Sequence, residues 1–216
     1  MTQLKAVLWD FGGVITSSPF DAFNRFERDH GIPRNFIRTV NATDPDTNAW
    51  ARFERSQISV EEFDRMFENE ARALGHAVHG RDVLQLLGGD LRPRMVEALK
   101  RCSRVFKTAC LTNNVRSGQG PGMMRDNARA KPMQNVMDLF DLVIESSREG
   151  IRKPSPAFYQ LACERLAIEP AEAVFLDDLG VNLKPARAMG MFTIKVVSED
   201  QALEDLAKVT GLELVG

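Results

Sequence analysis

The sequence predicts an α/β fold: a parallel sheet covered by helices, with a separate group of helices inserted after the first strand. Two observations support this. Short apolar runs alternate with helical patterns from about residue 93 onward. Between the first apolar run and this alternating half lies a long segment with helical periodicity and no clear strand. Strands that alternate with helices favour a parallel sheet with right-handed crossovers.

Five strands are expected. The first ends in the apolar run Ala6-Val7-Leu8-Trp9, and each of the others is a short run rich in apolar residues. In order, the expected strands are Leu4–Trp9, Val105–Leu111, Leu142–Ile144, Ala173–Leu176 and Phe192–Val197.

Helices are expected between these strands. Met95, Val96 and Leu99 have helical spacing, and Ala157–Leu166 places apolar residues on one face. A further helix runs over Leu183–Met189 and is closed by a glycine, Gly190. Ser198 with Gln201 has the spacing of a cap for the last helix, which Gly211 ends.

The segment from about Phe20 to Gly89 is expected to be a small helical bundle. Its aromatic residues recur at helical spacing, and Ser59 with Glu62 forms a capping-box pattern before an apolar stripe. We interpret most of these aromatic residues as core packing, while one or two of them could face a ligand.

A polar stretch between Val115 and Lys131 is expected to be a loop. It contains Gly118, Gly120, Pro121 and Gly122. A loop of this length could border a site, or it could be an ordinary excursion on the surface.

Composition narrows the function classes. A chain of 216 residues with 44% hydrophobic content can bury a full core and a small inserted domain. The formal net charge of -2 argues against bulk binding of nucleic acid. Three widely spaced cysteines suit a reducing compartment, and none of them forms a CxxC pair typical of zinc sites.

We expect a cytoplasmic protein that does not enter a membrane. Near the N-terminus, Lys5 precedes only a short apolar run, which does not match a signal peptide. No apolar stretch approaches the roughly 20 residues that are needed to span a bilayer.

Asp10 is the most informative residue of the first strand. It ends a buried apolar run and is followed by Phe11-Gly12-Gly13. Burying an unpartnered carboxylate costs several kcal/mol, which is about half of a typical domain's stability. The two glycines allow a ligand or a metal ion to approach the backbone. On this segment alone, a functional Asp and a solvated Asp in a tight turn both remain open.

Three further polar sets favour the functional interpretation. Thr112-Asn113-Asn114 follows one apolar run, and Asp177-Asp178 follows another, with Asn182 four residues after Asp178. Lys153 lies just before a helical pattern. In open α/β sheets, ligands bind at the carboxyl ends of the strands. Carboxylates, a lysine and hydroxyl or amide donors together suit an anion and a divalent cation.

In their order and combination, these motifs resemble those of the haloacid dehalogenase-like superfamily. Within it, the chain is most similar to the phosphatase-like N-terminal domain of soluble epoxide hydrolases and its bacterial relatives. The similarity covers nearly the whole chain and is carried by Phe140–Ser146, Lys153-Pro154 and Phe175–Arg187.

The resemblance implies a Rossmann-like core with an inserted helical cap domain that covers the active site. We therefore assign residues 1–16 and 91–216 to the core and residues 17–90 to the cap.

The resemblance also implies roles for single residues. Asp10 would be the nucleophile that forms an aspartyl-phosphate, and Lys153 would neutralise both this carboxylate and a phosphate oxygen. Mg²⁺ would be bound by Asp10, the Gly12 carbonyl and Asp178. The remaining expected site residues are Thr112 and Asn113 for phosphate binding, with Asp177 and Asn182 supporting the metal site.

Gly12 departs from the family pattern. Phosphatases of this family usually carry a second Asp at this position, which protonates the leaving oxygen and then activates water. General acid-base catalysis contributes roughly 10²–10⁴ in rate. The sequence therefore predicts a Mg²⁺-dependent phosphatase that is slow, or one whose substrate has a good leaving group, such as a sugar 1-phosphate or an acyl phosphate.

Two alternatives stay open. A 2-haloacid dehalogenase uses the same Asp nucleophile without a metal ion, and a catalytically impaired relative would bind phosphate without turnover. As partners we expect a small phosphorylated substrate, no nucleic acid and no membrane, and we allow for a homodimer.

Overall fold

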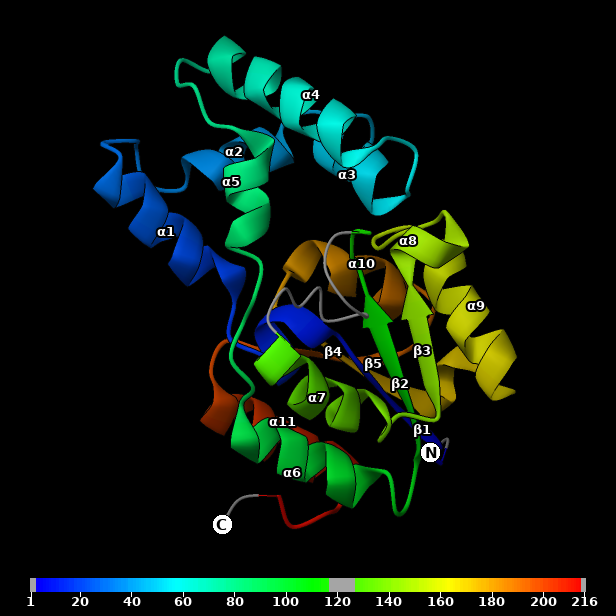
Figure 1. Ribbon diagram of the computed structural model, residues 1–216. Helices are drawn as coiled ribbons and strands as arrows, with labels where there is room; N and C mark the ends of the chain where they lie inside the picture. Colours follow the sequence, from blue (N-terminus) through cyan, green and yellow to red (C-terminus); the bar gives the residue numbers. More distant parts are fainter. Residues whose placement is uncertain (1–2, 117–126, 215–216) are drawn as a thin grey trace.

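The computed structural model describes residues 3–116 and 127–214 and shows a parallel sheet with helices on both faces (Figure 1). The strand order is β3-β2-β1-β4-β5, with β1 at the centre. The five predicted strands are confirmed, with ends that differ by one or two residues. The strands are β1 (Ala6–Trp9), β2 (Lys107–Thr112), β3 (Leu142–Glu145), β4 (Ala173–Asp177) and β5 (Phe192–Lys195).

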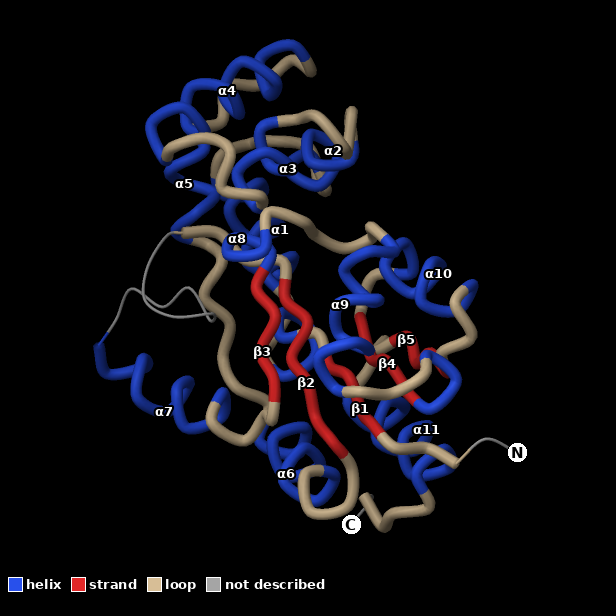
Figure 2. Tube along the Cα trace, turned by 90° about the vertical axis from the view of Figure 1, so that its right-hand side faces the viewer, coloured by secondary structure: helices blue, strands red, loops and turns tan. Residues whose placement is uncertain are grey.

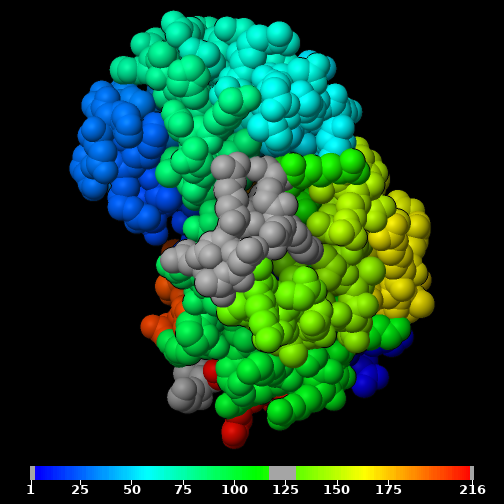
Figure 3. All heavy atoms as spheres, viewed as in Figure 1, coloured from blue at the N-terminus to red at the C-terminus, as the bar shows by residue number. Residues whose placement is uncertain are grey.

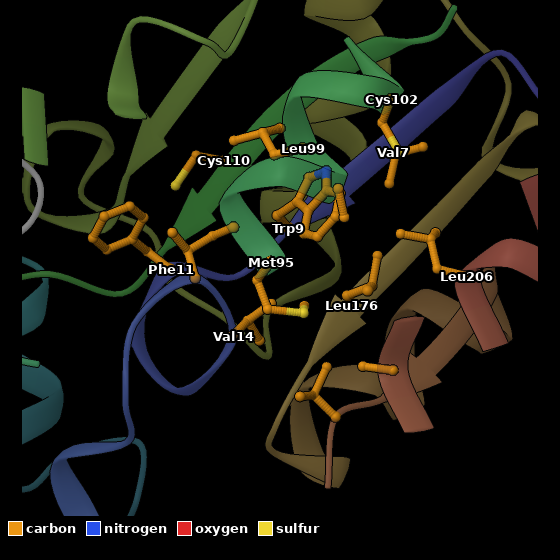
Figure 4. Packing of buried hydrophobic residues seen from close by; sticks show 14 of the residues in the cluster. Val7, Trp9, Phe11, Val14, Met95, Leu99, Cys102, Cys110, Leu176 and Leu206 are labelled. Atoms are coloured by element: carbon orange, nitrogen blue, oxygen red, sulfur yellow. The ribbon is translucent and has the colours of Figure 1, made fainter. Parts of the chain in front are cut away.

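Helices surround the strands of the sheet (Figure 2), and two hydrophobic clusters fix these helices to its two faces. On one face, Trp9 packs with Leu99 and Leu206 (Figure 4), and on the other face Leu8 packs with Phe158. All four residues of β1 are fully buried because alternate side chains enter the two clusters. The first face is covered by α6 (Pro93–Cys102), α7 (Asn127–Met137) and α11 (Glu199–Thr210), and the second by α9 (Pro156–Leu166) and α10 (Gly180–Ala188).

The inserted segment forms a helical bundle above the carboxyl ends of the strands (Figure 1). It has its own hydrophobic cluster, in which Phe63 packs against Phe53 and Phe67. The predicted capping box is present, because Ser59 and Glu62 bond reciprocally to each other's backbone N–H groups. The helices are α1 (Pro19–Asp29), α2 (Phe36–Ala42), α3 (Ala49–Glu54), α4 (Val60–Ala73) and α5 (Gly80–Gln85).

The two chain segments that link this bundle to the sheet run antiparallel and are bonded to each other. Thr16 and Leu91 form a bridge, and the Ser17 N–H donates to the Asp90 carbonyl at 2.8 Å. Gly89 must be a glycine, because a Cβ there would lie 2.5 Å from the Ser17 carbonyl oxygen. The division into residues 1–16 with 91–216 and residues 17–90 stays a prediction, which the separate hydrophobic cluster of the bundle supports.

Two expectations need correction. The predicted loop between Val115 and Lys131 is partly helical, since α7 begins at Asn127. The sequence did not predict α7 because its first turn contains polar residues and Pro132 interrupts its helical pattern. The four glycine and proline positions predicted there lie outside the described residues. Helix α10 begins at Gly180 rather than Leu183.

Short helical segments complete the core. The helix α8 (Ser146–Glu149) and the 3₁₀ turn η2 (Pro170–Glu172) were not predicted, because one turn gives little periodicity. Among the described residues, no helix is both long and apolar enough to cross a bilayer.

Candidate active site

The parallel sheet brings the predicted polar residues to one edge. β1 pairs with β2 on one side and with β4 on the other, with Trp9 opposite Cys110 and Leu176. The Asp10 N–H still donates to the Leu176 carbonyl at 2.8 Å, so Asp10 stays at the tip of the sheet. Parallel strands that share this register end together, which is why residues distant in sequence meet here.

Asp10 is buried and held by two donors. Its Oδ1 accepts from Lys153 Nζ at 2.8 Å and from the Phe11 N–H at 2.7 Å. Burial raises the pKa of Asp10 well above its usual value, and Asp177 and Asp178 add to the rise while Lys153 opposes it. No partner is recorded for Oδ2 among the described residues, so this oxygen is free to meet a ligand.

Lys153 lies at the centre of the carboxylates. Its side chain is 1% exposed, and Nζ also contacts Asp177 Oδ2 at 2.7 Å. Burial by itself lowers the pKa of a lysine, but Asp10 and Asp177 outweigh this effect and raise the pKa of Lys153. The lysine therefore remains protonated and can neutralise negative charge at Asp10.

The backbone of Lys153 is clamped by Asn113. The Lys153 N–H donates to Asn113 Oδ1 at 2.9 Å, and Asn113 Nδ2 donates to the Lys153 carbonyl at 3.0 Å. The side-chain amide of Asn113 is therefore occupied, which leaves the backbone of Asn113 for its predicted contact with phosphate. Thr112 is buried at the end of β2 on the same edge.

Both carboxylate oxygens of Asp177 accept hydrogen bonds from protein groups. Oδ2 accepts from Lys153, Oδ1 accepts from the Leu179 N–H at 2.8 Å, and Asn182 Nδ2 lies 3.0 Å from both oxygens. Asn182 is held in turn by the Tyr159 hydroxyl, which donates to its carbonyl at 2.6 Å. Protein donors thus occupy both oxygens of Asp177, and its role in supporting the metal ligands stays a prediction.

Asp178 faces the turn after β1. Burial, followed by the charge of Asp177, raises the pKa of Asp178 to about 6, while Lys153 and Arg92 oppose the rise. Gly13 has φ +81°, and a Cβ on it would lie 2.3 Å from Asp178 Oδ2. The sequence pair Gly12-Gly13 therefore includes one glycine that is required for this close approach.

Arg92 is a site residue that the sequence did not reveal. Its Nη1 donates to the Gly13 carbonyl at 2.9 Å, and its charge acts on Asp178. The only signal in the sequence is its place directly after the inserted segment.

The donor set fits a divalent cation. Carboxylate oxygens of Asp10, Asp177 and Asp178 lie within 4.8 Å of one another. When ionised, three carboxylates beside one lysine leave an excess of negative charge, which a hard divalent ion would neutralise. Since Asp177 is occupied by protein donors, Asp10 and Asp178 are the side chains that would hold the ion. The Gly12 carbonyl as a third ligand stays a prediction.

Comparison with known proteins places the chain in a family. The sequence profile of the haloacid dehalogenase-like hydrolases matches residues 4–190. The chain is 33% identical over 219 residues to acyl-CoA dehydrogenase family member 10 of Mus musculus, covering 97% of this chain and 19% of that protein. It is 32% identical to bifunctional epoxide hydrolase 2 of Sus scrofa, covering 98% of this chain and 40% of that protein. The chain thus spans less than half the length of these two relatives.

Two further relatives match over nearly their whole length. Sesquiterpene phosphatase astK of Aspergillus oryzae is 24% identical over 97% of this chain and 98% of its own. A solved magnesium complex of a HAD family enzyme from Bacteroides thetaiotaomicron has a TM-score of 0.63 at 20% identity, over 96% of this chain and 98% of its own. The fold, the strand-end residues and the profile match lead to one conclusion: the chain belongs to the haloacid dehalogenase-like hydrolases.

Proposed function

We propose that the chain is a Mg²⁺-dependent phosphatase of small phosphorylated metabolites that acts through an aspartyl-phosphate at Asp10. The observation that carries this proposal is the 2.8 Å contact between the buried Lys153 ammonium and Asp10 beside two further carboxylates. A phosphatase among the full-length relatives supports the same chemistry.

The first step is attack on phosphorus. The Asp10 carboxylate forms a P–O bond as the ester P–O bond breaks, and the phosphoryl group moves to Asp10. Lys153 balances charge on Asp10 and on a phosphoryl oxygen. Asp10 and Asp178 would hold a Mg²⁺ ion, which would supply neutralisation of charge on the phosphate.

The second step is hydrolysis of the aspartyl-phosphate by water. The leaving oxygen needs a proton in the first step, and the water must lose one in the second step. Gly12 carries no side chain for either transfer, so we infer slow turnover or a substrate with a good leaving group.

The three cysteines are free and buried, which suits the expected cytoplasmic location, and the homodimer stays a prediction.

A screen of phosphorylated metabolites tests the proposal. Phosphate release would be measured with Mg²⁺ and with a chelator, using Asp10→Asn as the control protein. We expect the wild-type protein to release phosphate with Mg²⁺ and not with the chelator, and we expect Asp10→Asn to release none under either condition. Chloride release from a 2-chloro acid without metal would identify the dehalogenase alternative. Phosphate binding without turnover of any substrate would identify the impaired relative.

A further inference from the structure

A buried ion pair joins the inserted bundle to the core beside the active site. Glu54, the last residue of α3, places Oε2 2.6 Å from Nε of Arg152, which lies in the core loop before α9. Only 7% of the Glu54 side chain and 18% of the Arg152 side chain are exposed. Figure 3 shows the cyan residues of the bundle packed directly against green and yellow-green residues of the core.

Neighbouring contacts fix the geometry of this pair. The Trp50 indole N–H donates to Glu54 Oε1 at 2.9 Å, and Arg152 Nη1 donates to the Pro45 carbonyl at 3.0 Å. Ser56 adds a second connection, since its hydroxyl donates to the Ser147 carbonyl at 2.7 Å. A buried ion pair with further hydrogen bonds is sensitive to small displacements, because either charge alone is poorly solvated.

Arg152 is covalently next to Lys153, whose backbone and ammonium are both fixed. The backbone of Lys153 is clamped by Asn113, and the Lys153 ammonium lies between Asp10 and Asp177. A side chain held by the bundle therefore restrains the same short loop that presents the lysine. Burial raises the pKa of Glu54, and Arg152 opposes this rise more than any other group, which is consistent with Arg152 being the main partner of this carboxylate.

We propose that Glu54 and Arg152 are positioning residues for Lys153, and that their ion pair couples the docking of the bundle on the core to the placement of the lysine. Moving α3 away from the core must separate Glu54 from Arg152. The loop then loses its contact with the bundle, and the ammonium is less firmly placed between the carboxylates. The kinetic part of this inference rests on the proposed phosphatase function, whereas the structural part does not.

Amide hydrogen exchange followed by NMR tests the structural part. The Lys153 N–H is a direct reporter because its acceptor is the Asn113 side chain. Glu54→Gln breaks the pair from the bundle side and Arg152→Gln breaks it from the core side, so the test survives if one variant fails to fold. Arg165→Gln is the matched control, because it removes the more exposed Arg165–Glu149 pair at 2.7 Å within the core.

The inference expects exchange at Lys153 and in α3 to become about tenfold faster in both test variants, the scale of coupling within one ion-pair network. In Arg165→Gln both rates should stay at the wild-type value. Faster exchange confined to α3, with Lys153 unchanged, would overturn the inference, since the pair would then only attach the bundle.

Kinetics add a second readout when kcat is expressed per folded enzyme, because partial unfolding by itself would lower the apparent kcat and leave KM unchanged. With a substrate from the screen, Glu54→Gln should lower kcat more than it raises KM, because the lysine acts in the chemical step. Arg152→Lys keeps a charge near Glu54 and should recover part of the loss relative to Arg152→Gln. Equal kcat in wild type and Glu54→Gln would contradict the coupling. Absence of turnover in the wild type would overturn the proposed function and leave the exchange experiment to decide this inference.

Discussion

Gly12 and Gly13 are neighbours with opposite steric surroundings. Gly12 has φ -69°, and a Cβ built on it meets nothing within 4 Å. Gly13 has φ +81°, and its Cβ would collide with the carboxylate of Asp178. A side chain at Gly12 would therefore meet neither a left-handed backbone conformation nor a neighbouring atom, and the position can accept one.

Gly12→Asp should increase the rate of hydrolysis of esters with poor leaving groups, because it supplies the missing proton donor. The gain would approach roughly 10²–10⁴ for an ideally placed acid and would be smaller for p-nitrophenyl phosphate, whose leaving group needs little protonation. Steady-state kinetics on both substrate classes measures this difference.

Gly13→Ala is the structural comparison for that experiment. It should lose about 1–3 kcal/mol of unfolding free energy through backbone strain, whereas Gly12→Ala should lose less. Unchanged rates on both substrates in a folded Gly12→Asp protein would show that another group already serves as the acid.

Asp10→Asn should abolish hydrolysis and leave the fold intact. An amide is a poor nucleophile. The amide oxygen can still accept from Lys153 and from the Phe11 N–H, and Lys153 keeps Asp177 as its charged partner, so the fold should be retained. Phosphate release and thermal melting measure the two effects. Normal turnover by this variant would rule out the covalent mechanism.

Lys153→Met should instead destabilise the protein by about 3–5 kcal/mol, because it leaves Asp10 and Asp177 buried without their cation. Urea unfolding measures this loss. The loss should shrink as pH falls, because the raised pKa of Asp10 lets this carboxyl take up a proton at a higher pH than usual; a loss that does not change with pH would contradict the explanation.

At the scale of elements, a buried carboxylate organises the start of the inserted bundle. Glu27 of α1 is fully buried and accepts from the N–H groups of Asn35 at 2.6 Å and Ile37 at 2.9 Å, at the beginning of α2. Asn35 itself makes no side-chain cap. One helix therefore satisfies the orphan donors of the next, which fixes the angle between them.

Glu27→Gln should destabilise the bundle by about 1–3 kcal/mol, because the amide replaces one acceptor with a donor and leaves a backbone N–H unpaired. Glu97→Gln, on the exposed face of α6, is the control and should change stability by less than about 0.5 kcal/mol. Urea unfolding of both variants makes the comparison, and equal stabilities would show that the Glu27 carboxylate is not needed as a cap.

At the scale of the whole molecule, the carboxylate cluster links metal binding, pH and stability. The pKa values of Asp10 and Asp178 are raised in the folded protein, to about 6 for Asp178. The folded state thus keeps protons that the unfolded chain releases near pH 4. The contribution of Asp178 to the unfolding free energy falls as pH rises from about 4 to about 6, and that of Asp10 also falls as pH rises above about 4. The charged cluster therefore costs stability at neutral pH unless a cation is bound.

Mg²⁺ should raise the melting temperature more at pH 7 than at pH 5, because protons compete for the same oxygens. At a free concentration one hundred times Kd, the gain is about 2.7 kcal/mol, or roughly 5–10 °C for a chain of this size. Differential scanning calorimetry at both pH values measures it. Asp178→Asn should show almost no Mg²⁺ effect, and a full shift in that variant would place the ion elsewhere.

Much of this architecture was predictable from the sequence. All five strands and the helical character of the insert follow from local periodicity. The positions of Asp10, Thr112 and Asp177 follow from one rule, that parallel strands end at a common edge. Helix α7 was missed because its first turn is polar and Pro132 interrupts its pattern.

The sequence by itself determined the elements, the edge of the sheet where the polar residues gather and the absence of an acid at Gly12, since each depends on residues close together in the chain. Only the tertiary structure decided that Asn113 clamps Lys153, that Arg92 reaches Gly13 across 79 positions and that Glu54 pairs with Arg152. The first two contacts join distant segments within the core and the third joins the bundle to the core. Side-chain packing between segments far apart in the chain leaves no periodic signal in the sequence.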